Sequence, residues 1–295
     1  MSEETLPTTE DLAGYQAERE LGRGTTGAVY LAASPRGEWV AVKRIPGAAP
    51  TDEIGVDLLR RQTERLIGIE HPHLVRIHDI VIAGADLCVV MEYVHGPNLR
   101  DVLAYQTPMR EQVARWVTSL GGALDYLHRL GIVHRDVKPS NVIVDQSGEV
   151  KLTDYVHLAA PGEAPVYGTP AYVSPEIARG DRAVDGRADV YSLACLAYEA
   201  LAGLPPFPVD QEHPEHAIRA HMRLAPPDPS ASLPQFPVET AKVLLRGLEK
   251  DPASRPHSAG RFAAALAATL SAAPEAPVQD APARERPAPT RAPAG

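Results

Sequence analysis

HRDVKPSN occupies residues 134–141, and Asp154 follows in the stretch KLTDYV at 151–156. Asp136 and Asn141 lie five residues apart, and Asp154 comes eighteen residues after Asp136. Two apolar stretches, IVHR at 132–135 and NVIV at 141–144, indicate short strands around a loop that would bring these side chains together. An acid, an amide and a second carboxylate could then serve one ATP molecule as a general base and two metal ligands.

Phosphoryl transfer suits this set because it requires positioning and charge neutralisation more than covalent chemistry from the protein. HRDVKPSN resembles the catalytic loop of eukaryotic-type (Hanks-type) bacterial serine/threonine protein kinases. Further segments resemble kinase segments in family order: LGRGTTGAVY at 21–30, VAVK at 40–43, HP at 71–72, MEYV at 91–94, GTPAYVSPE at 168–176, DVYSLACLAYEALAG at 189–203 and KDPASRP at 250–256. The resemblance covers roughly residues 15–270.

The fold class that follows is α+β, with two lobes. The resemblance implies a small antiparallel β lobe with one main helix, and a larger, mostly helical lobe. Apolar or alternating runs predict strands at 27–33, 38–45, 75–82 and 86–92, with a helix at about 52–69. Helical periodicity dominates from Leu99 onward, at 112–130, 189–203, 239–250 and 258–270.

Four regions are therefore expected along the chain. They are a flexible N-terminal arm at 1–14, a small lobe with its hinge at 15–95, a large lobe at 96–270, and a disordered Pro/Ala-rich tail at 271–295. For the tail, an inert tether is favoured over a peptide ligand of the SH3 type.

Composition excludes several classes of protein. A net charge of −9 disfavours a nucleic-acid partner, and 44% apolar residues are enough for a core. The acidic, polar start lacks the pattern of a secretory signal, and no apolar run approaches eighteen residues, so a cytoplasmic protein without membrane insertion is expected. Cys88 and Cys195 lie in apolar runs without CxxC spacing, which predicts buried, reduced thiols.

Gly22, Gly24 and Gly27 form a G-x-G-x-x-G pattern that a strand, AVYLAA, follows. A dinucleotide-binding fingerprint would open a helix there, so a phosphate-covering hairpin is favoured, with a purely structural hairpin and a surface Lys43 as the alternative. By resemblance, Lys43 contacts the α- and β-phosphates. The resemblance assigns ATP binding to Leu21, Gly22, Gly24, Gly27, Val29, Ala41, Lys43, Met91, Glu92, Val94, Ile143 and Asp154.

The catalytic roles come from the same resemblance. Asp136 would accept the proton of a Ser or Thr hydroxyl, Lys138 would stabilise the transferred γ-phosphoryl, and Asn141 and Asp154 would hold Mg²⁺ or Mn²⁺. Thr169 would bond Asp136 and Lys138 and so tie the substrate platform to the catalytic loop. Lys138 and GTPAYVSPE favour a protein substrate over a small molecule.

Four polar residues are expected to support the large lobe without touching substrate. The resemblance implies a buried ion pair between Glu176 and Arg255, and it implies that Asp189 holds the backbone of the catalytic loop. His134 is expected to be a core residue and not a proton carrier.

Gln62 stands where the kinase family has a helical glutamate that holds Lys43. It is expected on the same helix face as Leu59 and Leu66. Its amide oxygen can accept a hydrogen bond from Lys43, but a neutral bond is about half as strong as a charge-assisted one. A weakened clamp is expected, and restoring the charge with Gln62→Glu should raise the rate.

The triplet DYV at 154–156 departs from the family's DFG. Tyr155 adds a hydroxyl that needs a hydrogen-bond partner or water, and Val156 replaces a residue able to adopt positive φ. We expect these changes to favour one fixed arrangement of Asp154.

Arg135 precedes the presumed base, and in similar kinases such an arginine pairs with a phosphorylated loop residue. The stretch HLAAPGEAPVYG at 157–168 contains no Ser or Thr, and Tyr167 is its one hydroxyl. Arg135 is therefore expected to pair with a carboxylate such as Glu163, to stay unpaired, or only to pack and be solvated. Control by Ser/Thr phosphorylation of this loop is not expected.

Two functions from different classes fit these residues. The first is an active Ser/Thr protein kinase, with turnover reduced by the weakened clamp. The second is a pseudokinase, a nucleotide- or partner-binding signalling module in which Gln62 and Val156 reflect a relaxed demand for turnover. The protein substrate, the upstream signal and the oligomeric state are not encoded in any recognisable motif.

Overall fold

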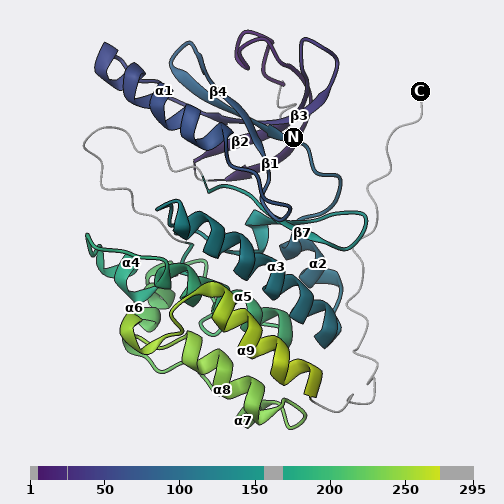
Figure 1. Cartoon of the computed structure of the whole chain (residues 1–295), viewed down its shortest axis with the longest axis vertical. Helices are drawn as coiled ribbons and strands as arrows, with labels where there is room; N and C mark the ends of the chain where they lie inside the picture. Colours follow the sequence, from purple (N-terminus) through teal and green to yellow (C-terminus); the bar gives the residue numbers. More distant parts are fainter. Residues whose placement is uncertain (1–5, 25, 156–168, 273–295) are drawn as a thin grey trace.

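The computed structural model describes residues 6–24, 26–155 and 169–272. They form a small lobe built on a sheet and a larger helical lobe, and Figure 1 shows the small lobe above the large one. The sheet contains β1 (Gln16–Gly24), β2 (Gly27–Ala33), β3 (Trp39–Ile45), β4 (Ile77–Ala83) and β5 (Asp86–Glu92). Its order is β1-β2-β3-β5-β4, and every neighbouring pair is antiparallel. The expected α+β, two-lobed architecture is confirmed.

The four strands predicted from apolar runs are present, whereas β1 had not been identified by such a run. Its sequence, QAERELGRG, is mostly exposed and carries few apolar residues, so periodicity could not reveal it. What makes it a strand is backbone pairing with β2, from Gln16 opposite Ala33 to Gly24 opposite Gly27.

Helix α1 (Glu53–Ile67) packs beside the sheet, and Asp52 caps its N-terminus. The Asp52 carboxylate accepts a hydrogen bond from the Gly55 N–H at 2.7 Å, a typical N-cap contact. Its buried side chains are Leu59, Thr63 and Leu66, which face the same core cluster as β4 and β5.

The two faces of the sheet serve two different cores because side chains alternate along each strand. Ala41, Val89 and Met91 belong to the main core, which continues into the large lobe. Val42 and Cys88 belong to a smaller cluster on the opposite face. Ala41 and Met91, two of the side chains predicted for the ATP site, thus point toward the large lobe.

Residues 8–14, predicted to be part of a flexible arm, cover that second face, so the prediction is wrong for them. Leu12 is fully buried in the smaller cluster, and the Gly14 N–H donates to the Thr9 carbonyl at 2.8 Å. Arg44 forms an ion pair with Asp11 at 3.5 Å. The apolar outer face of the sheet provides the reason, since it would otherwise be exposed to water.

The large lobe is mainly helical, as expected. Its helices are α2 (Leu99–Tyr105), α3 (Arg110–Arg129), α4 (Pro175–Arg179), α5 (Arg187–Ala202), α6 (Pro214–Arg223), α7 (Pro229–Ser232), α8 (Val238–Gly247) and α9 (Ala259–Ala272), with 3₁₀ turns η1 (Pro139–Asn141) and η2 (Pro252–Ser254). Helix α5 is buried around most of its circumference and forms the centre of the lobe. Gly121 permits close contact of α3 with α9, because a Cβ there would lie 2.8 Å from the Ala263 Cβ.

The catalytic loop leads into a two-stranded sheet of β6 (Val142–Val144) and β7 (Val150–Leu152). The strand predicted at 141–144 is present, but the one predicted at 132–135 is wrong. Arg135 adopts φ of 64°, and the backbone N–H groups of His134 and Arg135 donate to Asp189 and not to a neighbouring strand.

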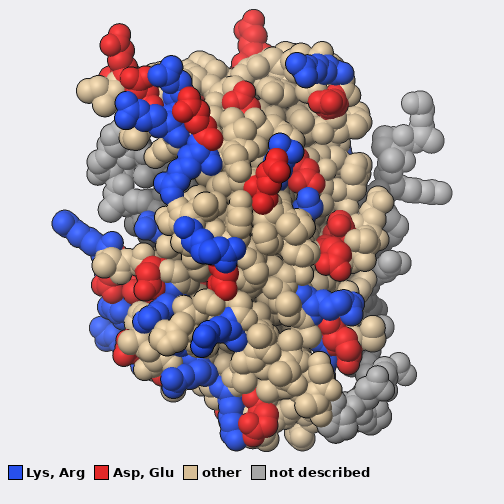
Figure 2. Space-filling model, viewed as in Figure 1, with Lys and Arg blue, Asp and Glu red and all other residues tan. Residues whose placement is uncertain are grey.

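The surface carries charges of both signs. Figure 2 shows basic and acidic side chains distributed over both lobes on the face displayed. Among the described helices, none combines the length and the apolar character needed to cross a membrane. Cys88 and Cys195 are buried free thiols, as predicted.

Candidate active site

Asp189, on the central helix α5, holds the backbone of the catalytic loop. Its carboxylate accepts hydrogen bonds from the His134 N–H at 2.8 Å and the Arg135 N–H at 2.7 Å, and it also contacts His128 Nε2 at 2.7 Å. Burial opposes ionisation of this carboxyl, but the bond from His128 and the nearby His134 lower its pKa overall. The role predicted for Asp189 is confirmed.

The His134 side chain is fully buried beneath the loop, and its Nε2 lies 3.0 Å from the Thr153 carbonyl. This contact joins the start of the catalytic loop to the residue before Asp154. The prediction that His134 is a core residue is confirmed.

Asp136 is the centre of a four-residue polar network. Lys138 Nζ lies 2.7 Å from Asp136 Oδ2, and Asn141 Nδ2 donates to the same oxygen at 3.1 Å. Asn141 Nδ2 also donates to the Asp136 carbonyl at 2.9 Å, so the turn η1 fixes the amide beside the acid. Burial raises the pKa of the Asp136 carboxyl, but the Lys138 ammonium outweighs this effect and leaves the pKa lowered. The carboxyl is thus ionised, as a proton acceptor must be.

Thr169 completes the network from a distant part of the chain. Its hydroxyl donates to Asp136 Oδ1 at 3.0 Å and accepts a hydrogen bond from Lys138 Nζ at 2.6 Å. Its backbone N–H also donates to Asp136 Oδ1, at 3.2 Å. The structure therefore contains both contacts predicted for Thr169.

The segment after Thr169 is held by a buried ion pair, as predicted. Arg255 donates to the two carboxylate oxygens of Glu176 at 2.6 and 2.8 Å, and both side chains are almost fully buried. Arg255 also donates to the carbonyls of Glu249, Arg187 and Lys250, so its remaining N–H groups are satisfied. This pair fixes the segment that carries Thr169 onto the rest of the large lobe.

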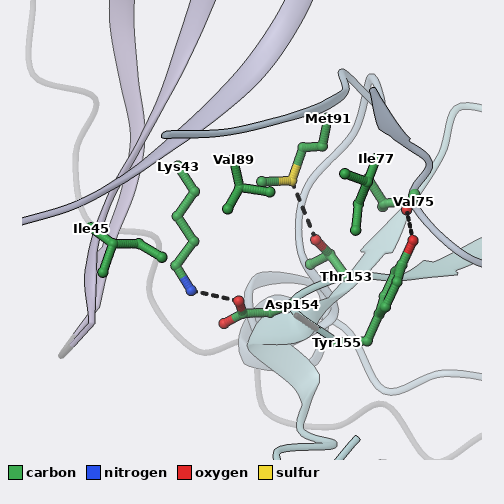
Figure 3. A pocket seen from close by; sticks show the side chains of 9 residues that line it. All are labelled: Lys43, Ile45, Val75, Ile77, Val89, Met91, Thr153, Asp154 and Tyr155. Atoms are coloured by element: carbon green, nitrogen blue, oxygen red, sulfur yellow. Dashed lines mark hydrogen bonds and ion pairs between the residues drawn. The ribbon is translucent and has the colours of Figure 1, made fainter. Parts of the chain in front are cut away.

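Lys43 and Asp154 meet across the gap between the lobes (Figure 3). Lys43 Nζ lies 2.5 Å from Asp154 Oδ1. Asp154 adopts φ of 67°, which turns the chain sharply after β7 and directs the carboxylate toward β3. The cation and the carboxylate that sequence analysis assigned to ATP and metal binding are therefore in contact.

Comparison with known proteins identifies the family. Residues 15–266 match the protein kinase domain model. The chain is 35% identical over 277 residues to a probable serine/threonine-protein kinase of Streptomyces coelicolor, covering 88% of this chain and 40% of that protein. The corresponding values for the serine/threonine-protein kinase PknB of Mycobacterium leprae are 36% identity over 277 residues, 89% and 44%.

The chain belongs to the protein kinase family. A solved structure, the PknI kinase domain of Mycobacterium tuberculosis, is similar with a TM-score of 0.71 and 33% identity, covering 90% of this chain and 100% of that one. The chain spans less than half the length of the two curated relatives.

The kinase-family residues expected around adenine share one core cluster. Ala41, Met91 and Val94 are buried in it, and Leu21, Val29 and Ile143 pack against it. They come from β1, β2, β3, β5, the segment after β5, and β6, which converge between the lobes.

The glycine hairpin of this kinase fold has one position that admits glycine alone. Gly27 adopts φ of 146°, and a Cβ there would lie 2.0 Å from the Arg44 carbonyl oxygen. Gly22 pairs with Val29 and Gly24 with Gly27, so the β1–β2 hairpin closes at this point. Glycine here permits close packing of β2 on β3, beyond any role toward phosphates.

Glu92 does not offer its carboxylate to the adenine slot. Lys151 Nζ contacts both Glu92 carboxylate oxygens, at 2.6 and 2.9 Å, and the Arg76 N–H donates to one of them at 3.3 Å. This arrangement links the end of β5 to β7 in the large lobe. The predicted contact of Glu92 with a nucleotide stays a prediction.

Gln62 does not hold Lys43, which corrects the expected clamp. Its side chain is exposed on α1, and Thr63 lies on the buried face beside Leu59 and Leu66. The Gln62 side chain makes no hydrogen bond to another described residue, whereas Lys43 is paired with Asp154. The periodicity that placed Gln62 inward was off by one residue, because a position three after Leu59 lies at the edge of the buried face.

The Tyr155 hydroxyl has a hydrogen-bond partner, as expected for a buried tyrosine. It donates to the Val75 carbonyl at 2.9 Å, and the ring is buried beneath the small lobe (Figure 3). The Thr153 hydroxyl contacts Met91 Sδ at 3.6 Å beside it. Val156, Glu163 and Tyr167 lie outside the described residues, so the expectations about them stay predictions.

A pocket behind Met91 was not identified from the sequence. Lys43 and Asp154 close one end, and the apolar side chains of Ile45, Val75, Ile77 and Val89 line it with Met91, Thr153 and Tyr155 (Figure 3). The one sequence signal for this pocket was the alternation of side chains along β3 and β5. Residues next to those of the outer-face cluster must point to the other side of the sheet, where the pocket lies.

Proposed function

We propose that this chain is an ATP-dependent serine/threonine protein kinase, which transfers the γ-phosphoryl group of ATP to Ser or Thr hydroxyls of proteins. One observation carries the proposal: Asp136, Lys138, Asn141 and Thr169 are joined in a single hydrogen-bonded network. Each of these groups has a separate task in phosphoryl transfer, and transfer depends mainly on their relative positions.

Asp136 accepts the proton of the attacking hydroxyl in this scheme. Its two carboxylate oxygens offer about four acceptor sites, and four donors occupy them: the Thr169 hydroxyl and N–H at Oδ1, and Lys138 and Asn141 at Oδ2. The attacking hydroxyl would therefore replace one of these donors. Because the pKa of Asp136 is lowered, it is ionised before substrate arrives. Its neighbours also fix its orientation, so the hydroxyl is held in line for attack.

Lys138 neutralises charge on the transferred group. Its ammonium has three N–H donors, of which Thr169 and Asp136 use two. The third is available for a γ-phosphoryl oxygen. The Lys43 ammonium also has N–H donors to spare. Its contact with Asp154 uses one of them and leaves the others for the α- and β-phosphates.

Asn141 and Asp154 fit a divalent cation. The Asn141 amide nitrogen is bonded to Asp136, which leaves its Oδ1 for a metal ion, and Asp154 is only partly buried. Oxygen donors of this kind suit Mg²⁺, with Mn²⁺ as the alternative. Held by these two residues, the ion would supply positive charge that offsets the charge of the phosphate groups.

The acceptor is proposed to be a protein and not a small molecule. Thr169 opens a well-packed segment that ends at Glu176, and it bonds directly to the proposed base. An extended substrate chain lying on this segment would place its hydroxyl beside Asp136.

A labelling assay tests the proposal. The purified chain, γ-labelled ATP, a general acceptor protein, and either Mg²⁺ or Mn²⁺ should give phosphoserine or phosphothreonine. Asp136→Asn should reduce the rate by about 10²–10⁴-fold while nucleotide affinity stays within a few fold, since removal of a general base acts on the chemical step. Labelling equal to that of the variant, with ATP still bound, would overturn the proposal and favour the pseudokinase.

A further inference from the structure

Three possible metal ligands gather at the start of α6, on different elements from Asn141 and Asp154. His213 precedes the helix, Pro214 opens it, and Glu215 and His216 lie in its first turn. One ligand atom from each of His213, Glu215 and His216 lies within 4.8 Å of the others, and all three side chains are exposed. They take no part in the kinase network described above.

The spacing suits a small transition-metal ion. Tetrahedral Zn²⁺ with bonds of about 2.0–2.1 Å to nitrogen and oxygen places its ligand atoms roughly 3.3–3.4 Å apart. His213 Nδ1 and Glu215 Oε1 are 3.3 Å apart. The His213 and His216 rings are stacked with centroids 5.0 Å apart, so a modest rotation of the exposed His216 ring would bring in the third donor.

The local charge favours a cation. A helix N-terminus carries roughly half a positive charge, which opposes cation binding. Asp210, Glu212 and Glu215 lie within six residues and contribute three negative charges against it.

One positive group competes for the site. Arg219 Nη2 lies 3.7 Å from Glu215 Oε1, one helical turn along α6. Both side chains are about half exposed, and exposed pairs of this kind contribute little to stability. A metal bond to the same carboxylate would therefore displace Arg219 at little cost.

We propose that His213, Glu215 and His216 bind a divalent transition-metal ion of the Zn²⁺ class, with water completing its coordination. Two imidazoles and one carboxylate form a donor set that zinc accepts, whereas Mg²⁺ and Ca²⁺ prefer oxygen ligands alone. Helix α6 packs beside α4, which follows the Thr169 segment (Figure 1). A bound ion would fix the first turn of the helix that supports this part of the large lobe.

Calorimetric titration of the whole chain with ZnCl₂, in excess MgCl₂ to occupy the Asn141 and Asp154 site, tests the proposal. One equivalent should bind with a dissociation constant in roughly the micromolar range, near −8 kcal/mol. His213→Ala and His216→Ala should each weaken binding at least about tenfold, because each removes one of three ligands. Arg219→Ala should tighten it a few fold by removing the competing cation.

His78→Ala is the matched control, since His78 is an exposed histidine on β4, outside the cluster. It should leave zinc affinity unchanged. The altered side chains are exposed, so thermal unfolding of the metal-free variants should match that of the parent chain. Absence of zinc binding by the parent chain, or equal affinity in the His213→Ala/His216→Ala double variant, would show that the site does not exist.

Discussion

The catalytic loop and the Lys43 region contain residues of the same candidate active site, but they are held very differently. Asp136 is bonded to Lys138, Asn141 and Thr169, and the loop backbone is anchored on fully buried Asp189. Among the described residues, Lys43 has one ionic contact, Asp154, and the helix expected to support it presents Gln62 to solvent. Buried, fully bonded networks are rigid, whereas a single partly exposed pair fixes little.

The two halves of the site therefore owe their geometry to different contacts. The large-lobe half of the site is held by contacts within the protein, so its geometry is a property of the fold. In the small-lobe half, Lys43 forms an ion pair with Asp154 and no hydrogen bond or ion pair with a described residue of α1, so its geometry depends on Asp154. Catalytic competence should therefore respond strongly to changes in the large-lobe network and weakly to changes at Gln62.

The largest effect is expected from the buried support of the large lobe. Arg255→Ala leaves the Glu176 carboxylate buried without a partner, and this should lower the free energy of unfolding by about 3–5 kcal/mol. Urea denaturation measures it. Arg179→Ala is the control: its ion pair with Asp181 at 3.1 Å is exposed, and its loss should cost less than about 1 kcal/mol. Equal losses for the two variants would contradict the comparison.

A smaller effect is expected at Thr169. Thr169→Val keeps the shape but removes the hydroxyl between Asp136 and Lys138, which should lower kcat about 10–100-fold with KM for ATP nearly unchanged. Steady-state kinetics on the protein acceptor measures both constants. Thr169→Ser retains the hydroxyl and should stay within a few fold of the parent chain. A loss as large for Ser as for Val would mean that packing, and not this hydrogen bond, matters.

The smallest effect is expected at Gln62. The sequence predicted that Gln62→Glu would raise the rate, but the exposed position of this side chain predicts a change of about twofold or less. The same kinetic assay measures it. A tenfold gain would show that α1 turns during catalysis and brings residue 62 to Lys43, which would remove the contrast between the two regions.

The sequence predicted most of the large-lobe site because its residues are close in the chain or belong to long motifs. Asp136, Lys138 and Asn141 lie within six residues, and a single turn, η1, sets their geometry. Thr169 and Asp189 are distant, and their contacts were expected from the resemblance alone. All of these contacts are present.

The predictions from the sequence were wrong for Gln62 and for the strand at 132–135. Gln62 was misplaced because helical periodicity does not fix rotation to within one residue when apolar positions are sparse. The strand expected at 132–135 is absent because Asp189 captures the backbone N–H groups that a strand would use. In both cases tertiary contacts determine the local structure, and these contacts cannot be predicted from the local sequence.

Leu12 has a practical consequence for any attempt to produce a shorter form of this protein. The family match begins at residue 15, and a chain cut there would keep every motif while uncovering the apolar patch around Tyr30, Val42 and Cys88. Such a patch promotes self-association at the concentrations used for crystals or spectroscopy. A truncated chain that begins at or before Thr8 keeps the natural cover, so the useful boundary of the domain lies several residues ahead of its first recognisable motif.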